Sequence, residues 1–211
     1  MRTQPPLSLD GLIAVASSRH GPEGHHDLPT VGVPPGPDHD HLLDPVAART
    51  WLGPRTEFDV PPGKLSRTDL ATLRAVRAAV QALADHRVSD YRARTARLLL
   101  GATFRLQPDG GLAPSAPGWA GFCAGLLVPL AALHSARSRL KRCDNPRCGW
   151  LFLDDSDNQR RRWCATVCGN RLNVRAHRAR RSGASPAARR ISGRRATGSG
   201  TSPAASPPAS A

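Results

Sequence analysis

The segment Cys143-Asp144-Asn145-Pro146-Arg147-Cys148 is followed, after fifteen intervening residues, by Cys164-Ala165-Thr166-Val167-Cys168. Two close pairs of thiols joined by a loop of this length supply the four tetrahedral ligands that a structural Zn²⁺ ion requires. The chain of 211 residues has five cysteines, and four of them lie in these two pairs. The sequence therefore predicts one structural zinc ion bound by Cys143, Cys148, Cys164 and Cys168.

Disulfide bonds and unliganded thiols are the alternatives to a zinc site. Disulfides are typical of secreted chains, and residues 1–18 contain neither the charged start nor the cleavage region of an export signal. We therefore expect a cytoplasmic protein with reduced thiols. The fifth cysteine, Cys123, lies in the apolar segment 119–127, where a free cysteine packs as a small hydrophobic residue.

The residues around the four cysteines resemble a known family. Residues 143–152 read CDNPRCGWLF, 160–164 read RRRWC, 168–171 read CGNR and 175–180 read RAHRAR. From about Leu140 to Arg181 this pattern is similar to the CGNR zinc-finger family of bacterial proteins. In that family four residues usually separate the last two cysteines, whereas three do so here. Cysteines four positions apart still share one face of a helix.

The resemblance implies more than a zinc finger. It implies an amino-terminal ABATE domain and a role as a stress-induced transcription regulator, with the finger as the part that binds nucleic acid. On this basis we expect a signal or small molecule to act on the amino-terminal domain, which is also where the chain could form a homodimer.

Positive charge is concentrated in and after the finger. Residues 137–195 contain 17 lysines and arginines against four aspartates, whereas the rest of the chain is almost neutral. Such a concentration predicts a polyanionic partner, and arginine suits phosphate and guanine contacts. The alternative explanation is a genome that favours arginine throughout. The first two thirds of the chain, where acidic and basic residues balance, argue against it. We expect nucleic acid, with DNA as the expected form, at Arg160, Arg161, Arg162, Asn170, Arg171, Arg175, His177, Arg178, Arg180 and Arg181.

A second hypothesis has the zinc module docking on an acidic protein surface. A third hypothesis places an active site in the first domain, but no enzyme motif supports it. The chain has no glycine-rich phosphate loop, no G-x-S-x-G and no H-E-x-x-H. A zinc ion with four cysteine ligands also has no open position for water. The acidic run 154–157 reads as a turn that offsets the arginines at 160–162. We therefore expect a protein that is neither an enzyme nor bound to a membrane.

The sequence predicts an α+β fold in three parts. Residues 1–140 form a mainly helical ABATE-like domain, 141–181 the finger and 182–211 a disordered basic and Ala/Pro/Ser-rich tail. Residues 19–40 are rich in glycine and proline and read as a loop. Its histidines could suggest a second metal site, but without a scaffold they are expected to be solvated: His20, His25, His26, His39 and His41.

Several elements of the first domain have local signals. Residues 7–18 are a strand or a short helix. Ser66, with Asp69 three residues later, predicts the start of a long helix, and Ser89-Asp90 opens a second that runs to about Leu100. Residues 103–107 and 112–114 flank an Asp-Gly turn and predict a hairpin. Residues 118–141 predict a core helix kinked by Pro129.

Three aromatic residues flank the predicted zinc ligands, and they have two interpretations. They form a small hydrophobic core beside the metal, or one ring is exposed and stacks on a base. These residues are Trp150, Phe152 and Trp163.

Overall fold

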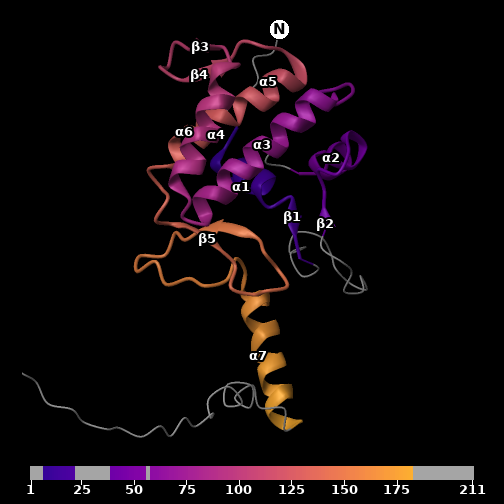
Figure 1. Ribbon diagram of the computed structural model, residues 1–211, viewed down its shortest axis with the longest axis vertical. Coiled ribbons are helices and arrows are strands. Elements are labelled where there is room, and N and C mark those ends of the chain that lie inside the picture. Colours follow the sequence, from indigo (N-terminus) through magenta and orange to yellow (C-terminus); the bar gives the residue numbers. More distant parts are fainter. Residues whose placement is uncertain (1–6, 22–38, 56–57, 183–211) are drawn as a thin grey trace, which may run out of the picture. The chain divides into compact units, whose positions relative to one another are not determined.

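The computed structural model describes residues 7–21, 39–55 and 58–182 (Figure 1). Met1–Leu172 cluster as one compact unit and Asn173–Ala211 as another. The helices are α1 (Leu9–Ala16), α2 (Pro45–Leu52), α3 (Arg67–Ala84), α4 (Val88–Leu100), α5 (Gly118–Gly125), α6 (Leu127–Leu133) and α7 (Thr166–Arg181). Three antiparallel hairpins pair β1 (Arg19–His20) with β2 (His39–Asp40), β3 (Phe104–Leu106) with β4 (Leu112–Pro114), and β5 (Leu140–Arg142) with β6 (Leu151–Leu153). The predicted α+β class is confirmed.

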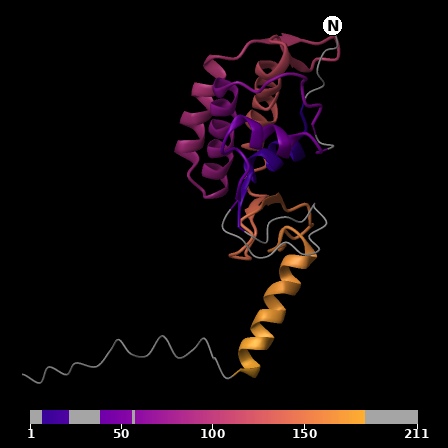
Figure 2. The ribbon, with the colours of Figure 1, turned by 90° about the vertical axis from the view of Figure 1, so that its right-hand side faces the viewer.

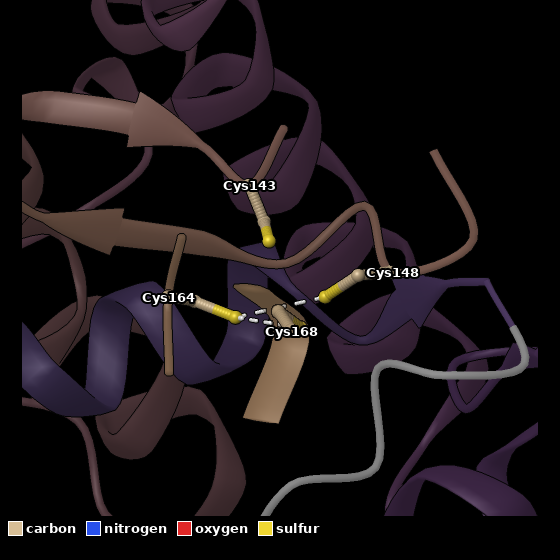
Figure 3. Close-up of side chains that lie close together, drawn as sticks. All are labelled: Cys143, Cys148, Cys164 and Cys168. Atoms are coloured by element: carbon tan, nitrogen blue, oxygen red, sulfur yellow. Dashed lines mark hydrogen bonds between the residues drawn. The ribbon is translucent and has the colours of Figure 1, made fainter. Parts of the chain in front are cut away.

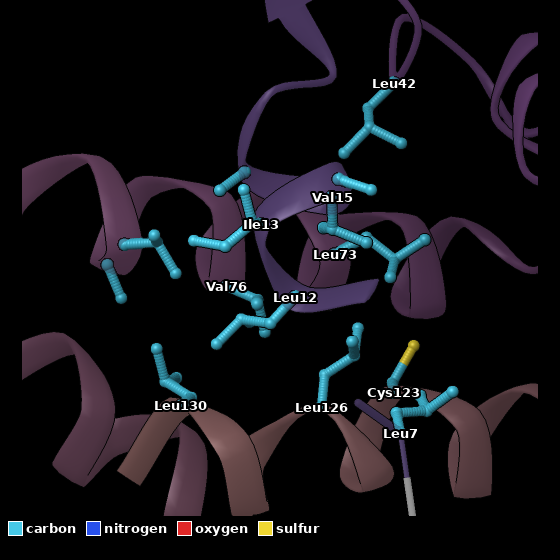
Figure 4. Packing of buried hydrophobic residues seen from close by; sticks show 14 of the residues in the cluster. Leu7, Leu12, Ile13, Val15, Leu42, Leu73, Val76, Cys123, Leu126 and Leu130 are labelled. Carbon is cyan, nitrogen blue, oxygen red and sulfur yellow. The ribbon is translucent and has the colours of Figure 1, made fainter. Parts of the chain in front are cut away.

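The hydrophobic core lies around helix α3, which packs against α1, α4, α5 and α6. Helices α3 and α4 lie side by side in both views (Figures 1 and 2). The side chains of Leu12, Leu73, Val76 and Leu130 are completely buried and meet between the helices (Figure 4). Cys123 lies in the same cluster, and burial raises the pKa of its thiol to about 12. It is the core residue that the sequence predicts.

The two long helices begin in different ways. The Ser66 hydroxyl accepts a hydrogen bond from the Asp69 N–H (3.1 Å), and the Asp69 carboxylate accepts one from the Ser66 N–H (3.1 Å). This reciprocal pair is the predicted capping box of α3. Helix α4 ends at Leu100 as predicted, but it starts at Val88 and has no side-chain cap, because Arg87 occupies the cap position.

The apolar segment that begins at Gly118 differs from its prediction in two ways. It forms two helices that break at Leu126, and Pro129 lies in the first turn of α6. Proline fits there because the N–H groups of a first turn have no partner within the helix, so the break comes before Pro129 and not at it. Residues after Leu133 form turns that lead into β5, so the helix does not continue to Lys141.

The hairpin β3–β4 confirms its prediction. Arg105 pairs with Ala113, Gly110 has a φ of 82° in the turn, and the Asp109 side chain accepts a hydrogen bond from the Gly111 N–H (2.9 Å). Residues 7–18, for which strand and helix were both open, contain helix α1, and its cap is Ser8.

Residues 19–40 were expected to form a loop, and their two ends are instead a paired ladder. Arg19 lies opposite Asp40, and His20 lies opposite His39. Asp40 also forms an ion pair with Arg77 of α3 (2.5 Å). This ion pair connects the second strand of the ladder to α3. His25 and His26, like the predicted tail from residue 183 onward, lie outside the described residues.

Among the helices of the described ranges, none is both long and apolar enough to cross a membrane.

Candidate metal centre

The first two cysteines lie in the turn between β5 and β6. The Cys143 N–H donates to the Trp150 carbonyl (2.8 Å), which extends the strand pairing by one step. Asn145 is completely buried, and its carbonyl accepts a hydrogen bond from the Cys148 N–H (2.9 Å). Its side-chain oxygen accepts one from the Arg147 N–H (3.2 Å). Asn145 therefore fixes the turn that brings the two thiols to one side.

The second pair of cysteines lies at the start of helix α7. Cys164 precedes the helix, and Cys168 lies in its first turn, where its N–H donates to the Ala165 carbonyl (3.0 Å). A Cβ atom on Gly169 would lie 3.0 Å from the indole ring of Trp163. Glycine at this position therefore allows Trp163 to pack on the first turn of α7, beside the sulfur atoms.

The four sulfur atoms converge on one point, as Figure 3 shows, and all lie within 4.8 Å of one another. Sγ of Cys164 is 3.6 Å from that of Cys148 and 3.8 Å from that of Cys168. Four sulfur atoms at 2.3 Å from a tetrahedral zinc ion lie about 3.8 Å apart. The cluster therefore fits one structural zinc ion. None of the chain's five cysteines, all of which are described, forms a disulfide.

The thiols of the cluster influence one another's ionisation. Hydrogen bonds from Cys148 and Cys164 lower the pKa of Cys143 to about 6. The interaction with Cys143 raises the pKa of Cys148 and that of Cys164, because their thiols donate to its sulfur. A zinc ion supplies the positive charge that allows all four groups to bind as thiolates.

The comparisons with known proteins agree with this geometry. Residues 139–181 match the CGNR zinc finger family. A search of curated proteins finds no match to the chain. The matched segment contains all four converging cysteines, so this part of the chain is a zinc-binding module. The shorter spacing of the last two cysteines does not prevent their sulfur atoms from meeting the other two.

The first residue of the acidic run, Asp154, is buried and holds the loop between β6 and Cys164. Asp154 accepts hydrogen bonds from Nζ of Lys141 (2.6 Å), from Ser156 and from the Arg161 N–H (2.9 Å). Burial acts to raise the pKa of Asp154, but these hydrogen bonds, with that of Lys141 the largest, hold the pKa well below its usual range. The acidic run thus organises its own loop, and only Asp155 pairs with one of the arginines, Arg161.

The arginines predicted to bind nucleic acid differ in their contacts. Arg161 donates to the carbonyls of Trp163 (3.2 Å) and Cys164 (2.6 Å) and pairs with Asp155 (3.0 Å). Arg162 pairs with Asp144 (2.7 Å). Arg161 therefore stabilises the loop before Cys164, and Arg162 connects this loop to the turn of the first two cysteines. All three arginines are exposed, and Arg160 has no such side-chain contact among the described residues.

The other predicted contact residues lie on helix α7. In its first part, Asn170 is exposed and Arg171 is half-buried. Farther along the helix, Arg175 is half-buried, and the remaining residues are exposed: His177, Arg178, Arg180 and Arg181.

Two of the three aromatic residues of the finger pack against the metal cluster. Trp150 and Trp163 are half-buried against the cysteines, and Phe152 is buried beneath the guanidinium of Arg161, 5.2 Å from its ring centroid. This arrangement agrees with the interpretation of a small hydrophobic core beside the metal.

The finger shares its hydrophobic packing with the helices. Leu140 and Leu151 belong to the same buried cluster as α1 and α3. The Leu151 N–H donates to the Ser17 hydroxyl (3.0 Å), and Arg142 pairs with Asp85 after α3 (2.8 Å). The sequence could not reveal this contact, because it joins residues more than 50 positions apart.

Proposed function

We propose that this protein is a nucleic-acid-binding regulator whose zinc module presents arginines to the phosphates of DNA. The observation that carries the proposal is the excess of 17 basic over four acidic residues between 137 and 195, combined with exposed side chains at Arg160, Arg178 and Arg181. The match of residues 139–181 to a zinc-finger family supports it.

The zinc ion has a structural role in this proposal. It fixes the turn before Cys148 and the start of α7, so that the arginines extend from an ordered backbone. Arg175, Arg178 and Arg181 follow one another at intervals of three along α7, so they line one side of the helix. A guanidinium group can donate two parallel hydrogen bonds to a phosphate. The role is not catalytic, because four thiolates fill the coordination sphere.

The proposal extends to the rest of the chain through the resemblance to ABATE-domain regulators. The helical part would receive a stress signal or a small molecule in the cytoplasm, where thiols remain reduced. Its contacts with β5 and β6 give such a signal a route to the finger.

The test is a fluorescence-anisotropy titration of labelled duplex DNA and RNA with the zinc-loaded full chain at several salt concentrations. If about five or six phosphates are contacted, log K should fall against log salt with a slope near −5 on duplex DNA. The variant with Arg175→Ala, Arg178→Ala and Arg181→Ala should flatten this slope by about 2 to 3.

The matched control removes three exposed arginines from α4, through Arg92→Ala, Arg94→Ala and Arg97→Ala. It lowers the net charge by the same amount and should leave the slope nearly unchanged. Equal losses in both variants would mean a general attraction of charge and contradict the assignment to α7. Binding to an acidic polypeptide but not to DNA or RNA would favour the acidic-partner hypothesis.

A further inference from the structure

The β1–β2 ladder brings together three histidines that the sequence places about twenty residues apart. His20 and His39 are register partners, and the His41 N–H continues the pairing by donating to the Ser18 carbonyl (2.8 Å). Partners across a ladder and residues two positions apart project from the same face. The ring centroids accordingly lie close together, at 5.1 Å for His20 and His41, 5.6 Å for His20 and His39, and 6.0 Å for His39 and His41.

One hydrogen bond fixes the protonation of His20. Its Nδ1 lies 2.8 Å from the Gly21 carbonyl oxygen. A carbonyl can only accept, so Nδ1 carries the proton, and in the neutral ring the lone pair is on Nε2. This Nε2 accepts a hydrogen bond from Nε2–H of His41 (3.1 Å), so an ion bound here would replace the proton between the two nitrogens. Histidines that bind metals have the same arrangement, with one ring N–H donated to a backbone carbonyl and the other nitrogen directed at the ion.

The spacing of the nitrogen atoms suits a metal ion. Two imidazole nitrogens at about 2.0–2.1 Å from one tetrahedral ion lie about 3.3–3.4 Å apart, close to the observed 3.1 Å. His39 is the third ring within reach. Its plane is only 7° from that of His41, so its side chain must rotate before it can present a nitrogen to the same ion.

We propose that His20 and His41, completed by His39, bind a second divalent transition-metal ion such as Zn²⁺ or Co²⁺, in addition to the zinc ion at the four cysteines. Imidazole suits metals of this class, whereas thiolates select the zinc of the finger. The surroundings favour a defined site: His20 is only 3% exposed and packs against Trp150, and His41 stacks on Trp51.

This second site lies directly against the finger. The Gly21 N–H donates to the Cys148 carbonyl (2.8 Å), and a Cβ atom on Gly21 would lie 2.3 Å from the Arg147 carbonyl oxygen. Only glycine allows the strand of His20 to approach so closely. An ion that fixes the rings of His20 and His41 therefore also holds the backbone beside one of the zinc ligands.

The test uses the full chain loaded with one equivalent of zinc and titrated with Co²⁺. We expect one further ion per chain, with the visible spectrum of cobalt bound by nitrogen and without the charge-transfer band of cobalt thiolates. His41→Gln and His39→Gln should each weaken this binding by more than about tenfold. His177→Gln on α7 and the double variant His25→Gln/His26→Gln are the controls and should leave it unchanged.

A second measurement does not depend on the variants folding. In nitrogen-15 spectra of the natural chain, the Nε2 signals of His20 and His41 should shift when Zn²⁺ is added, while Nδ1 of His20 stays protonated. Absence of a second ion, its retention in His41→Gln, or its loss in the His25/His26 variant would each overturn the proposal. These measurements do not involve nucleic acid, so their outcome does not depend on the proposed function.

Discussion

Three consecutive arginines in the finger have different contacts, although the sequence gives no reason to separate them. Arg161 donates to two backbone carbonyls next to the zinc ligands, Arg162 pairs with Asp144, and Arg160 is exposed. A side chain already bound to the protein must break those contacts before it can bind a phosphate. Arg160 is therefore the residue of the three that is available to nucleic acid at the lowest cost.

Replacing these arginines should separate stability from binding. Arg161→Ala removes charged hydrogen bonds to the Trp163 and Cys164 carbonyls and should destabilise the finger by about 1 to 3 kcal/mol. Arg160→Ala should change stability by less than about 0.5 kcal/mol and weaken DNA binding. Urea unfolding followed by tryptophan fluorescence, together with anisotropy titrations, measures both effects. Equal stability losses in the two variants would contradict the different roles.

Asp154 should give the finger a characteristic pH dependence. Its folded pKa is held well below the unfolded value of about 3.9, so its stabilising contribution is fully present above that value and is lost as the pH falls below it. Asp154→Asn should therefore lower the melting temperature of the zinc-loaded chain by an amount that is constant between about pH 5 and 7. A difference that changes within this range would show that the folded carboxyl titrates there, which would contradict a pKa held below its usual range.

Among the elements, those with local determinants follow from the sequence and those with distant partners do not. The cysteine pairs, the Ser66 capping box and the Asp109-Gly110 turn depend on residues a few positions apart, and all three are present as predicted. The β1–β2 ladder joins strands separated by residues 21–38, and its Asp40 pairs with Arg77 of a helix that is distant in the sequence. Pro129 lies in the first turn of α6, so the chain breaks at Leu126 and not at the proline.

The starts of α3 and α4 offer a matched test of one such local signal. Ser66→Ala removes the hydroxyl that accepts the Asp69 N–H, leaves the bond from the Ser66 N–H to the Asp69 carboxylate, and should destabilise the protein by about 1 kcal/mol. Ser89→Ala is the same chemical change at the start of α4, where no side chain caps the helix, so we expect less than about 0.5 kcal/mol. Urea titrations of the two variants make the comparison. Similar losses would indicate that Ser89 has a capping role after all.

In the compact unit Met1–Leu172, shared packing and a hydrogen bond join the metal centre to the helical core. Leu151 of β6 is completely buried in the cluster that contains α1 and α3, and its N–H is bonded to Ser17 at the end of α1. Cys143 and Cys148 lie in the turn that joins β5 and β6, so a zinc ion bound by them should stabilise this hairpin. Zinc binding should therefore also stabilise the helices.

Removal of zinc should consequently loosen more than the finger. Structural zinc ions contribute about 10 to 16 kcal/mol in isolated modules, and Leu151→Ala alone should cost about 2 to 5 kcal/mol. We expect a chelator to lower the hydrogen-exchange protection of α1 and of the neighbouring part of α3 by at least about tenfold, equivalent to about 1.4 kcal/mol. Hydrogen exchange with and without zinc, resolved by peptide, measures this change.

The hairpin β3–β4 provides the internal control, because its strand β4 packs on α5. Its exchange should change less than that of α1 when zinc is removed. If α1 and α3 keep their full protection while residues 143–172 lose theirs, the shared leucines add little and the module folds independently of the helices. If α1 loses protection in Leu151→Ala with zinc still bound, the coupling runs through this side chain, because the ion itself is unchanged.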